Sequence, residues 1–279
     1  MNDKNEVTDI NMIDLGLDKE INRIVMDGIR QVTINNMPEL PYAVEEAINR
    51  LRININFLGS KVRKIMVISS LPDEGKSFVA MQLWAQMAKA GTKSILVDAD
   101  LRKSVMVDKY DIETSDGSKI LGISGYLAGN YELKDVILHS QYEAGDLIPN
   151  TDNIVNPSIL IEGGQFENML NTVAEEYRYV FVDSPPLGIV SDGEQIGQMC
   201  DGAILVVRGG TTSKQVIRAT MQQLERCGCP LLGVVLNRVQ GGKGSYYSKG
   251  YGKGYGYYGR HYGYGYYGKS YTDQYYGEK

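Results

Sequence analysis

Residues 70–77, with the sequence Ser-Leu-Pro-Asp-Glu-Gly-Lys-Ser, have the spacing of a phosphate-binding loop, except that Ser replaces the usual first Gly. They follow the apolar run 65–68 and precede a helical pattern, which is the context that such a loop needs. In these loops backbone N–H groups at a helix N-terminus hold the β-phosphate, the Lys reaches the β and γ oxygens, and the hydroxyl binds Mg²⁺. The sequence therefore predicts an ATP and Mg²⁺ site formed by Ser70, Leu71, Pro72, Asp73, Glu74, Gly75, Lys76 and Ser77.

Three carboxylates stand at the ends of apolar runs that are typical of buried strands. Asp98 and Asp100 follow the run 95–97, and a spacing of two puts both side chains on the same side of the chain. Asp183 closes the run 179–182, which is the pattern of a Walker B aspartate that holds Mg²⁺ through water. Acidic residues also end strands as turn formers, and the pair Asp98 and Asp100 alone is equally well explained in that way. Because all three converge on one phosphate loop, we expect them to belong to the same site.

Five short apolar runs without polar alternation indicate strands that are buried on both faces. They lie at 65–68, 95–97, 179–182, 203–207 and 231–236, and the stretches between them at 76–90, 167–177, 192–200 and 213–227 have helical length and pattern. The segment 42–57 also has apolar residues at helical spacing. Strands that alternate with helices predict an α/β fold with a mostly parallel sheet flanked by helices on both faces. Ligands of such sheets bind beyond the carboxyl ends of the strands, where the loop and the carboxylates stand.

The tyrosines of the chain are concentrated near its C-terminus. Of the 20 tyrosines 13 lie in residues 241–279, together with 12 of the 32 glycines. This segment has a formal charge of +4, whereas the rest of the chain has −9. With so much Gly and no hydrophobic periodicity, the segment cannot bury enough surface to offset its ordering entropy, and we expect a disordered tail.

The remaining segments define the expected domain boundaries. Residues 1–41 hold eight Asp and Glu against four Lys and Arg and show no sustained periodicity, which predicts an irregular N-terminal segment. We therefore expect three parts, namely 1–41, an ATP-binding domain at 42–240, and the tail at 241–279. No signal peptide and no stretch of 18 apolar residues is found, so we expect a cytoplasmic protein. Cys200, Cys227 and Cys229 include no CxxC pair, and we expect buried thiols.

Several of these motifs together resemble the bacterial tyrosine kinases of capsule and exopolysaccharide synthesis. They are the phosphate loop, the segment Leu-Val-Asp-Ala-Asp-Leu-Arg at 96–102, the segment Val-Phe-Val-Asp-Ser-Pro-Pro at 180–186, and the C-terminal tyrosine cluster. The likeness covers residues 42–240 and the tail, and Asp192 and Asn156-Pro157-Ser158 also match family positions. It implies a P-loop kinase domain that phosphorylates its own tyrosine cluster in trans and regulates polysaccharide synthesis and export.

The resemblance also implies roles for residues at the expected site. Lys76 and Ser77 would bind phosphate and Mg²⁺, and Asp100 and Asp183 would position the metal. Asp98 would accept the proton of the attacking tyrosine, whose pKa of about 10 makes a positioned base useful at neutral pH.

Further roles follow from the same resemblance. Arg102 would belong to the catalytic group, and Asn237 would contact adenine, as in related P-loop ATPases. The phosphoacceptors would be Tyr246, Tyr247, Tyr251, Tyr255, Tyr257, Tyr258, Tyr262, Tyr264, Tyr266, Tyr267, Tyr271, Tyr275 and Tyr276.

Partners are implied in the same way. The chain would form a homo-oligomer in which copies phosphorylate one another, and a membrane-anchored adaptor of the polysaccharide chain-length type would recruit it to the inner face of the membrane. A protein-tyrosine phosphatase would reverse the modification, and no nucleic acid is expected. Ring-forming members carry Glu-x-x-Arg-x-x-Arg on the first helix, and Asn49 stands here at the first Arg position.

Two alternatives explain part of the sequence. A partitioning or positioning ATPase of the ParA and MinD type would use ATP for dimerisation and surface binding. Such proteins carry an extra Lys near the start of the phosphate loop, where this chain has Ser70-Leu71-Pro72. A condensate-forming protein would explain the Gly and Tyr tail but not the three carboxylates.

Overall fold

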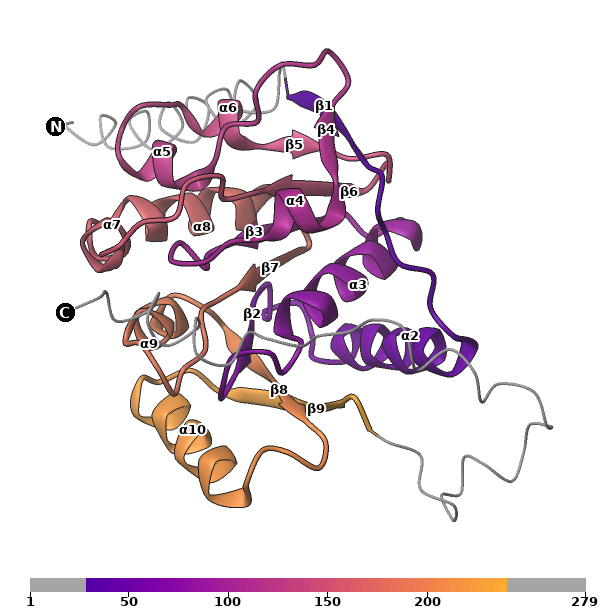
Figure 1. The fold of residues 1–279 in the computed structure, drawn as a ribbon, viewed down its shortest axis with the longest axis vertical. Helices are drawn as coiled ribbons and strands as arrows, with labels where there is room; N and C mark the ends of the chain where they lie inside the picture. Colours follow the sequence, from indigo (N-terminus) through magenta and orange to yellow (C-terminus); the bar gives the residue numbers. More distant parts are fainter. Residues whose placement is uncertain (1–28, 240–279) are drawn as a thin grey trace, which may run out of the picture.

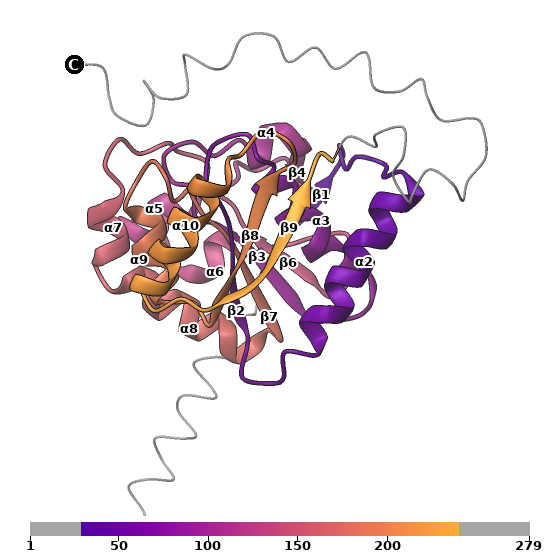
Figure 2. The ribbon, with the colours of Figure 1, turned by 90° about the horizontal axis from the view of Figure 1, so that it is seen from below.

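The computed structural model describes residues 29–239, in which a nine-stranded, mostly parallel sheet is covered by helices on both faces (Figure 1, Figure 2). The strand order is β4-β1-β5-β6-β3-β7-β2-β8-β9. The strands are β1 (Arg30–Ile34), β2 (Lys64–Ser69), β3 (Ser94–Asp98), β4 (Ile112–Thr114), β5 (Leu138–His139), β6 (Gly145–Ile148), β7 (Tyr179–Asp183), β8 (Gly202–Arg208) and β9 (Leu231–Asn237). This confirms the α/β fold that the sequence predicts.

The sheet divides the hydrophobic core into two layers, and helices cover each of them. One layer packs α5 to α10 against one face of the sheet, and the other packs α2, α3 and α4 against the opposite face. The helices are α2 (Tyr42–Asn56), α3 (Lys76–Lys89), α4 (Met106–Tyr110), α5 (Ile123–Leu127), α6 (Leu133–Val136), α7 (Ser158–Glu162), α8 (Gln165–Glu176), α9 (Asp192–Gln198) and α10 (Lys214–Arg226). The central strands are therefore shielded from water on both sides, which explains their continuous runs of Ile, Val and Leu.

The register of the central strands brings the three sequence motifs to one edge of the sheet. In the parallel pair of β3 and β7, Asp98 lies directly opposite Asp183. The next strand, β2, lies between β7 and β8 and leads into the phosphate loop. Because parallel strands end at the same edge, the loop and both carboxylate motifs meet there.

The prediction of an irregular segment at 1–41 is wrong for β1, which pairs antiparallel with β4 and parallel with β5. Exposed and buried residues alternate in β1, and only Val32 and Ile34 are buried apolar residues. So short an alternation does not stand out from a polar neighbourhood. The elements between residues 105 and 163 were also not predicted, because each has five residues or fewer.

Three other expectations concern particular residues. Cys200, Cys227 and Cys229 are buried free thiols, as predicted. Within residues 29–239, no helix is both long enough and apolar enough to cross a membrane. The expected tail at 241–279 and its tyrosines lie outside the described residues.

Candidate active site

The phosphate loop passes from β2 to α3, and Gly75 occupies its most restricted position. Gly75 has a φ of 93°, in the left-handed region, and it is the N-cap of α3, which has no side-chain cap. A Cβ at this position would lie 2.1 Å from Nδ2 of Asn237, so a larger residue would displace Asn237. The same Nδ2 donates a hydrogen bond to the backbone oxygen of Glu74 at 2.9 Å. Asn237 therefore packs directly on the loop, beside a helix N-terminus that suits an anion.

The carboxylate of Glu74 is buried, and protein groups occupy both of its oxygens. Oε2 accepts a hydrogen bond from the backbone N–H of Leu71 at 2.8 Å. Oε1 accepts one from the backbone N–H of Arg208 at 3.2 Å and another from the hydroxyl of Thr212. Glu74 thus shapes the phosphate loop from within and joins it to the end of β8.

The start of the loop is held from two directions. The hydroxyl of Thr220, on α10, donates a hydrogen bond to Oγ of Ser70 at 2.9 Å. The backbone N–H groups of Leu187 and Gly188, after β7, donate to the carbonyl oxygens of Ser69 and Ser70 at 3.0 Å each. The Ser that replaces the usual Gly therefore uses its hydroxyl to bind α10.

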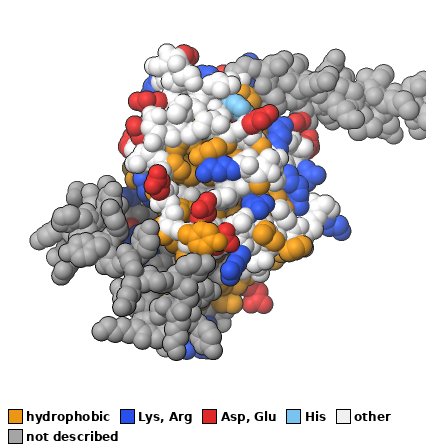
Figure 3. Space-filling view, turned by 90° about the vertical axis from the view of Figure 1, so that its right-hand side faces the viewer, with side chains coloured by type: hydrophobic (Ala, Val, Ile, Leu, Met, Phe, Trp, Pro, Cys, Tyr) orange, Lys and Arg blue, Asp and Glu red, His pale blue; other side chains and the backbone are white. Residues whose placement is uncertain are grey.

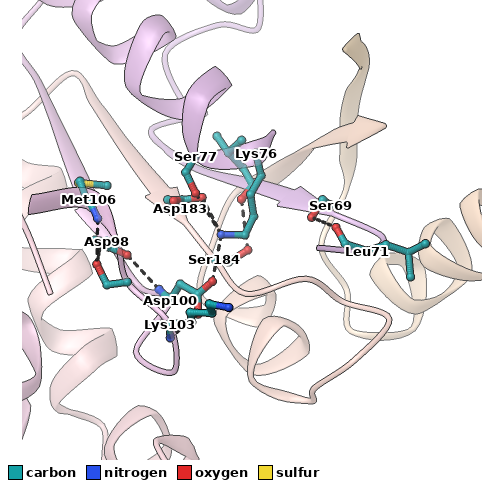
Figure 4. A network of polar contacts seen from close by, with 12 residues as sticks. Ser69, Leu71, Lys76, Ser77, Asp98, Asp100, Lys103, Met106, Asp183 and Ser184 are labelled. Atoms are coloured by element: carbon teal, nitrogen blue, oxygen red, sulfur yellow. Dashed lines mark hydrogen bonds and ion pairs between the residues drawn. The ribbon is translucent and has the colours of Figure 1, made fainter. Parts of the chain in front are cut away.

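Lys76 lies between two of the three carboxylates (Figure 4). Its Nζ is 3.1 Å from Oδ2 of Asp100 and 3.3 Å from Oδ1 of Asp183, and it donates to the hydroxyl of Ser77 at 3.3 Å. Asp98 lines the same small cavity as Ser77, Asp100 and Asp183. Two nearly buried carboxylates thus contact one ammonium group and a third lies nearby, so negative charge is in excess.

This excess changes the acid strength of Asp98. Burial, and in addition the negative charges of Asp183 and Asp100, raise the pKa of Asp98 to about 8. A hydrogen bond from the hydroxyl of Ser104 to Oδ2 of Asp98, and the charge of Lys76, oppose this rise. Burial also raises the pKa of Asp183, against the opposing effect of Lys76. A carboxylate with a raised pKa is a stronger base, so Asp98 suits the removal of a proton from a hydroxyl.

The donor set fits a nucleotide with Mg²⁺. Ser77, Asp100 and Asp183 offer only oxygen atoms, which are the ligands that Mg²⁺ prefers. In residues 29–239 no group of three His, Cys, Asp or Glu side chains is arranged to hold a metal by itself. Phosphate and water oxygens would therefore have to complete the coordination, as is usual where Mg²⁺ binds together with a nucleotide.

Four polar residues that line or support this cavity were not predicted. Lys103, Lys109 and Tyr110 line it, and Ser104 binds Asp98. Burial lowers the pKa of both lysines, and the hydroxyl of Tyr110 is buried without a hydrogen-bond partner in the described part of the chain. The only sequence signal for them is their position within about a dozen residues of Asp98, which does not distinguish them from their neighbours.

Arg102 lies on the loop that follows Asp98 and contains Asp100, and its contacts are on the side of this loop away from Lys76. Its Nε and Nη2 donate to Oδ2 and Oδ1 of Asp192 at 2.5 and 3.2 Å, and its Nη1 donates to the carbonyl oxygen of Val155 at 3.0 Å. The hydroxyl of Ser158 donates to Oδ1 of the same Asp192 at 2.7 Å. The structure therefore brings together Arg102, Asp192 and Ser158, which all belong to the motifs of the sequence resemblance.

Comparisons with known proteins identify the family of this chain. Residues 62–209 match the AAA domain family. Tyrosine-protein kinase CpsD of Streptococcus agalactiae is 34% identical over 211 residues, which are 75% of this chain and 90% of that protein. The solved kinase domain of the Escherichia coli tyrosine kinase ETK has a TM-score of 0.66 and 29% identity, and the match covers 79% of this chain and 86% of that domain.

A likeness of fold alone extends to a positioning ATPase. The septum site-determining protein MinD of Pyrococcus horikoshii, solved with Mg-ADP, has a TM-score of 0.54 and 22% identity, and the match covers 63% of this chain and 70% of MinD. The higher identity to CpsD extends over most of both chains. With its phosphate loop and three carboxylates in one site, the chain belongs to the bacterial tyrosine-protein kinases, which are P-loop enzymes that bind a nucleotide and phosphorylate tyrosine.

Proposed function

We propose that the chain transfers the γ-phosphoryl group of ATP to tyrosines of residues 241–279, on a neighbouring copy, and thereby regulates capsular or exopolysaccharide synthesis and export. One observation supports this proposal most strongly. Lys76 lies between Asp100 and Asp183, and Asp98, with its raised pKa, lines the same cavity. Phosphoryl transfer to a hydroxyl needs a phosphate-directed cation, oxygen ligands for a metal and a base close together, and these residues could supply all three.

On the nucleotide side, backbone N–H groups at the start of α3 and the ammonium group of Lys76 bind the β- and γ-phosphates. Asn237 contacts the adenine from its position beside Gly75. Ser77, Asp100 and Asp183 supply oxygens to Mg²⁺, which when bound neutralises charge on the phosphates.

On the acceptor side, Asp98 takes the proton of the tyrosine hydroxyl as the oxygen attacks the γ-phosphorus. Asp98 is only 2% exposed, and the cavity beside it, of about 10 Å³, has room for about one water molecule. A phenol ring does not fit there. The segment 103–109, which lines the cavity, therefore moves aside when the acceptor binds.

The assembly of the kinase is part of the proposal. On the side of the molecule that carries α2, apolar side chains lie in separate groups among charged ones (Figure 3). Tyr42, Ile53 and Phe57 of this region are exposed. Asn49, at the first Arg position of the ring motif, accepts hydrogen bonds from Nε and Nη2 of Arg52 at 3.0 and 2.8 Å. We place the contact between copies on this helix.

Two further partners complete the proposed function. A membrane-anchored adaptor recruits the kinase to the inner face of the membrane and activates it, and a protein-tyrosine phosphatase removes the phosphates.

The experiment compares wild type, Lys76→Met and a chain that ends at residue 240. Each is incubated with Mg²⁺ and ATP, alone or with Lys76→Met as the substrate, and phosphotyrosines are located by mass spectrometry. We expect labelling of wild type after residue 241, no self-labelling of Lys76→Met, and labelling of the Lys76→Met tail by the shortened chain. Equal self-labelling of wild type and Lys76→Met would contradict the proposed site, and a Lys76→Met tail that stays unlabelled would contradict transfer in trans.

A further inference from the structure

The loop that follows β3 makes different contacts on its two sides. On one side Asp98 and Asp100 face the phosphate loop, where Asp100 binds Lys76. On the other side the carbonyl oxygen of Leu101 accepts a hydrogen bond from the backbone N–H of Ile154 at 2.7 Å. The side chain of Arg102 extends the contacts on this second side. The contacts on this second side therefore also help to determine the positions of the two carboxylates.

The partner of Arg102 lies on a segment that itself holds the phosphate loop. Asp192 begins α9, and Leu187 and Gly188, a few residues earlier, donate hydrogen bonds to the start of that loop. The end of the loop, at Lys76, binds Asp100 instead. The pair of Arg102 and Asp192 thus links the two motifs that grip the phosphate loop at its opposite ends.

The chemistry of this pair suits a rigid link. The side chain of Asp192 is 1% exposed and that of Arg102 13% exposed. The guanidinium group binds both carboxylate oxygens, and Ser158 adds a further hydrogen bond to one of them. An arginine that binds both oxygens of a carboxylate forms a strong pair with a fixed geometry. Lys, whose charge is a single point, could not replace Arg102 without losing that geometry. Removing one partner leaves a buried charge without compensation.

We infer that Asp192, supported by Ser158, acts through Arg102 as a positioning residue that fixes Asp98 and Asp100 relative to the phosphate loop. Arg102 is then also a positioning residue, and it does not contact the transferred phosphoryl group. This inference rests on the proposed kinase function and adds residues to it. Binding of ADP without metal depends on the backbone of the phosphate loop and on Lys76, which the pair does not touch. Transfer depends on alignment, where an error of about 1 Å costs roughly 100-fold in rate.

The test is a double-mutant cycle with Arg102→Gln, Asp192→Asn and the double variant. For each we measure kcat and KM for ATP in tail phosphorylation, the affinity for ADP, and the melting temperature. Each single change should lower kcat by roughly 30- to 100-fold with KM and ADP affinity within about threefold of wild type. The double variant should lose no more than the worse single variant, because the two residues act as one unit. Ser158→Ala should lose less, and Ser158→Thr should retain the wild-type rate.

Asp146→Asn is the matched control. Asp146 is also a buried carboxylate, and it binds His139 and Tyr177 away from the site. We expect its kcat to stay near that of wild type even if its melting temperature falls.

Three results would overturn the inference. They are a kcat of Asp192→Asn within twofold of wild type, losses that multiply in the double variant, or an ADP affinity that falls as much as kcat. If Asp192→Asn does not fold, the comparison of Ser158→Ala with Ser158→Thr decides, and equal rates of these two variants overturn it. A wild type that labels no tyrosine would instead contradict the proposed function, which separates the two failures.

Discussion

Asp98→Asn should stabilise the nucleotide-free, metal-free protein, and the gain should grow with pH. The pKa of Asp98 is about 8 in the folded protein, mainly because the carboxyl is buried, and 3.8 is its ordinary value. Between these values the folded protein holds about one proton more than the unfolded chain, so folding becomes less favourable as pH rises. Linkage sets this loss of folding free energy at up to about 1.4 kcal/mol for each pH unit. The loss is absent below about pH 4 and complete above about pH 8.

Asn has no such charge to bury. Its oxygen keeps the hydrogen bond from the backbone N–H of Asp100, and its NH2 group donates to the hydroxyl of Ser104, which can accept as well as donate. At pH 8.5 we expect a gain on the order of 5 kcal/mol in the free energy of unfolding, or roughly 10–20 °C in melting temperature. At pH 5 the gain should be much smaller. The measurement is thermal unfolding in EDTA at both pH values.

Asp192→Asn is the control for this stability measurement, because its buried carboxylate is paired with Arg102 and the change should lower the melting temperature. A melting temperature of Asp98→Asn at or below that of wild type at pH 8.5 would refute the reasoning. So would a gain that does not increase between pH 5 and pH 8.5.

Three more predictions follow from contacts of the loop and from the charge of the chain. Gly75→Ala should lower ADP affinity at least about tenfold and destabilise the fold by roughly 1–3 kcal/mol, because of the positive φ and the clash with Asn237. Calorimetry measures the affinity and thermal unfolding the stability, and an unchanged affinity would contradict this prediction. Thr220→Val should lower the free energy of unfolding by about 1–2 kcal/mol, because the hydrogen bond to Ser70 is lost. Thr220→Ser keeps a hydroxyl and should be more stable than Thr220→Val. Equal stability of the two variants would argue against the bond. Phosphorylation of residues 241–279 should dissociate the oligomer at low salt, because two or three phosphates with about −1.5 to −2 charges each cancel the charge of +4 of that segment. Sedimentation at two ionic strengths tests this, and identical masses with and without phosphate would refute it.

The parts of the fold that the sequence predicts are those whose signal is local and continuous along the chain. The five predicted apolar runs become β2, β3, β7, β8 and β9, because strands buried on both faces need uninterrupted apolar residues. β1 has too few apolar residues for a pattern, and its existence depends on β4 and β5, which lie far along the chain. Such strands form because tertiary pairing outweighs local preference.

In the site, too, the local features could be predicted from the sequence and the long-range contacts could not. The sequence predicts the phosphate loop from the spacing of Gly75, Lys76 and Ser77, and it predicts the carboxylates from their positions after apolar runs. In both cases the position along the chain decides where the side chain lies in the fold. The contacts that support these residues are not predicted in this way. Ser70 binds Thr220 from 150 residues away. Arg102, expected among the catalytic residues, binds Asp192 at a separation of 90 residues. No local pattern relates such pairs, which only the packing of α9 and α10 on the sheet brings together.

The central place of β2 has a consequence for how the protein is made. β2 is synthesised early, yet both of its neighbours in the sheet, β7 and β8, come late, and Lys76 and Asp183 are 107 residues apart. Contacts of such large sequence separation form slowly. On the ribosome the strand that leads into the phosphate loop therefore has both edges unpaired until residue 183 has emerged, and one edge unpaired until residue 208 has emerged. A chain that stalls before β7 lacks Asp183 and cannot form the nucleotide site. It presents an apolar strand with two open edges, which favours capture by chaperones or aggregation.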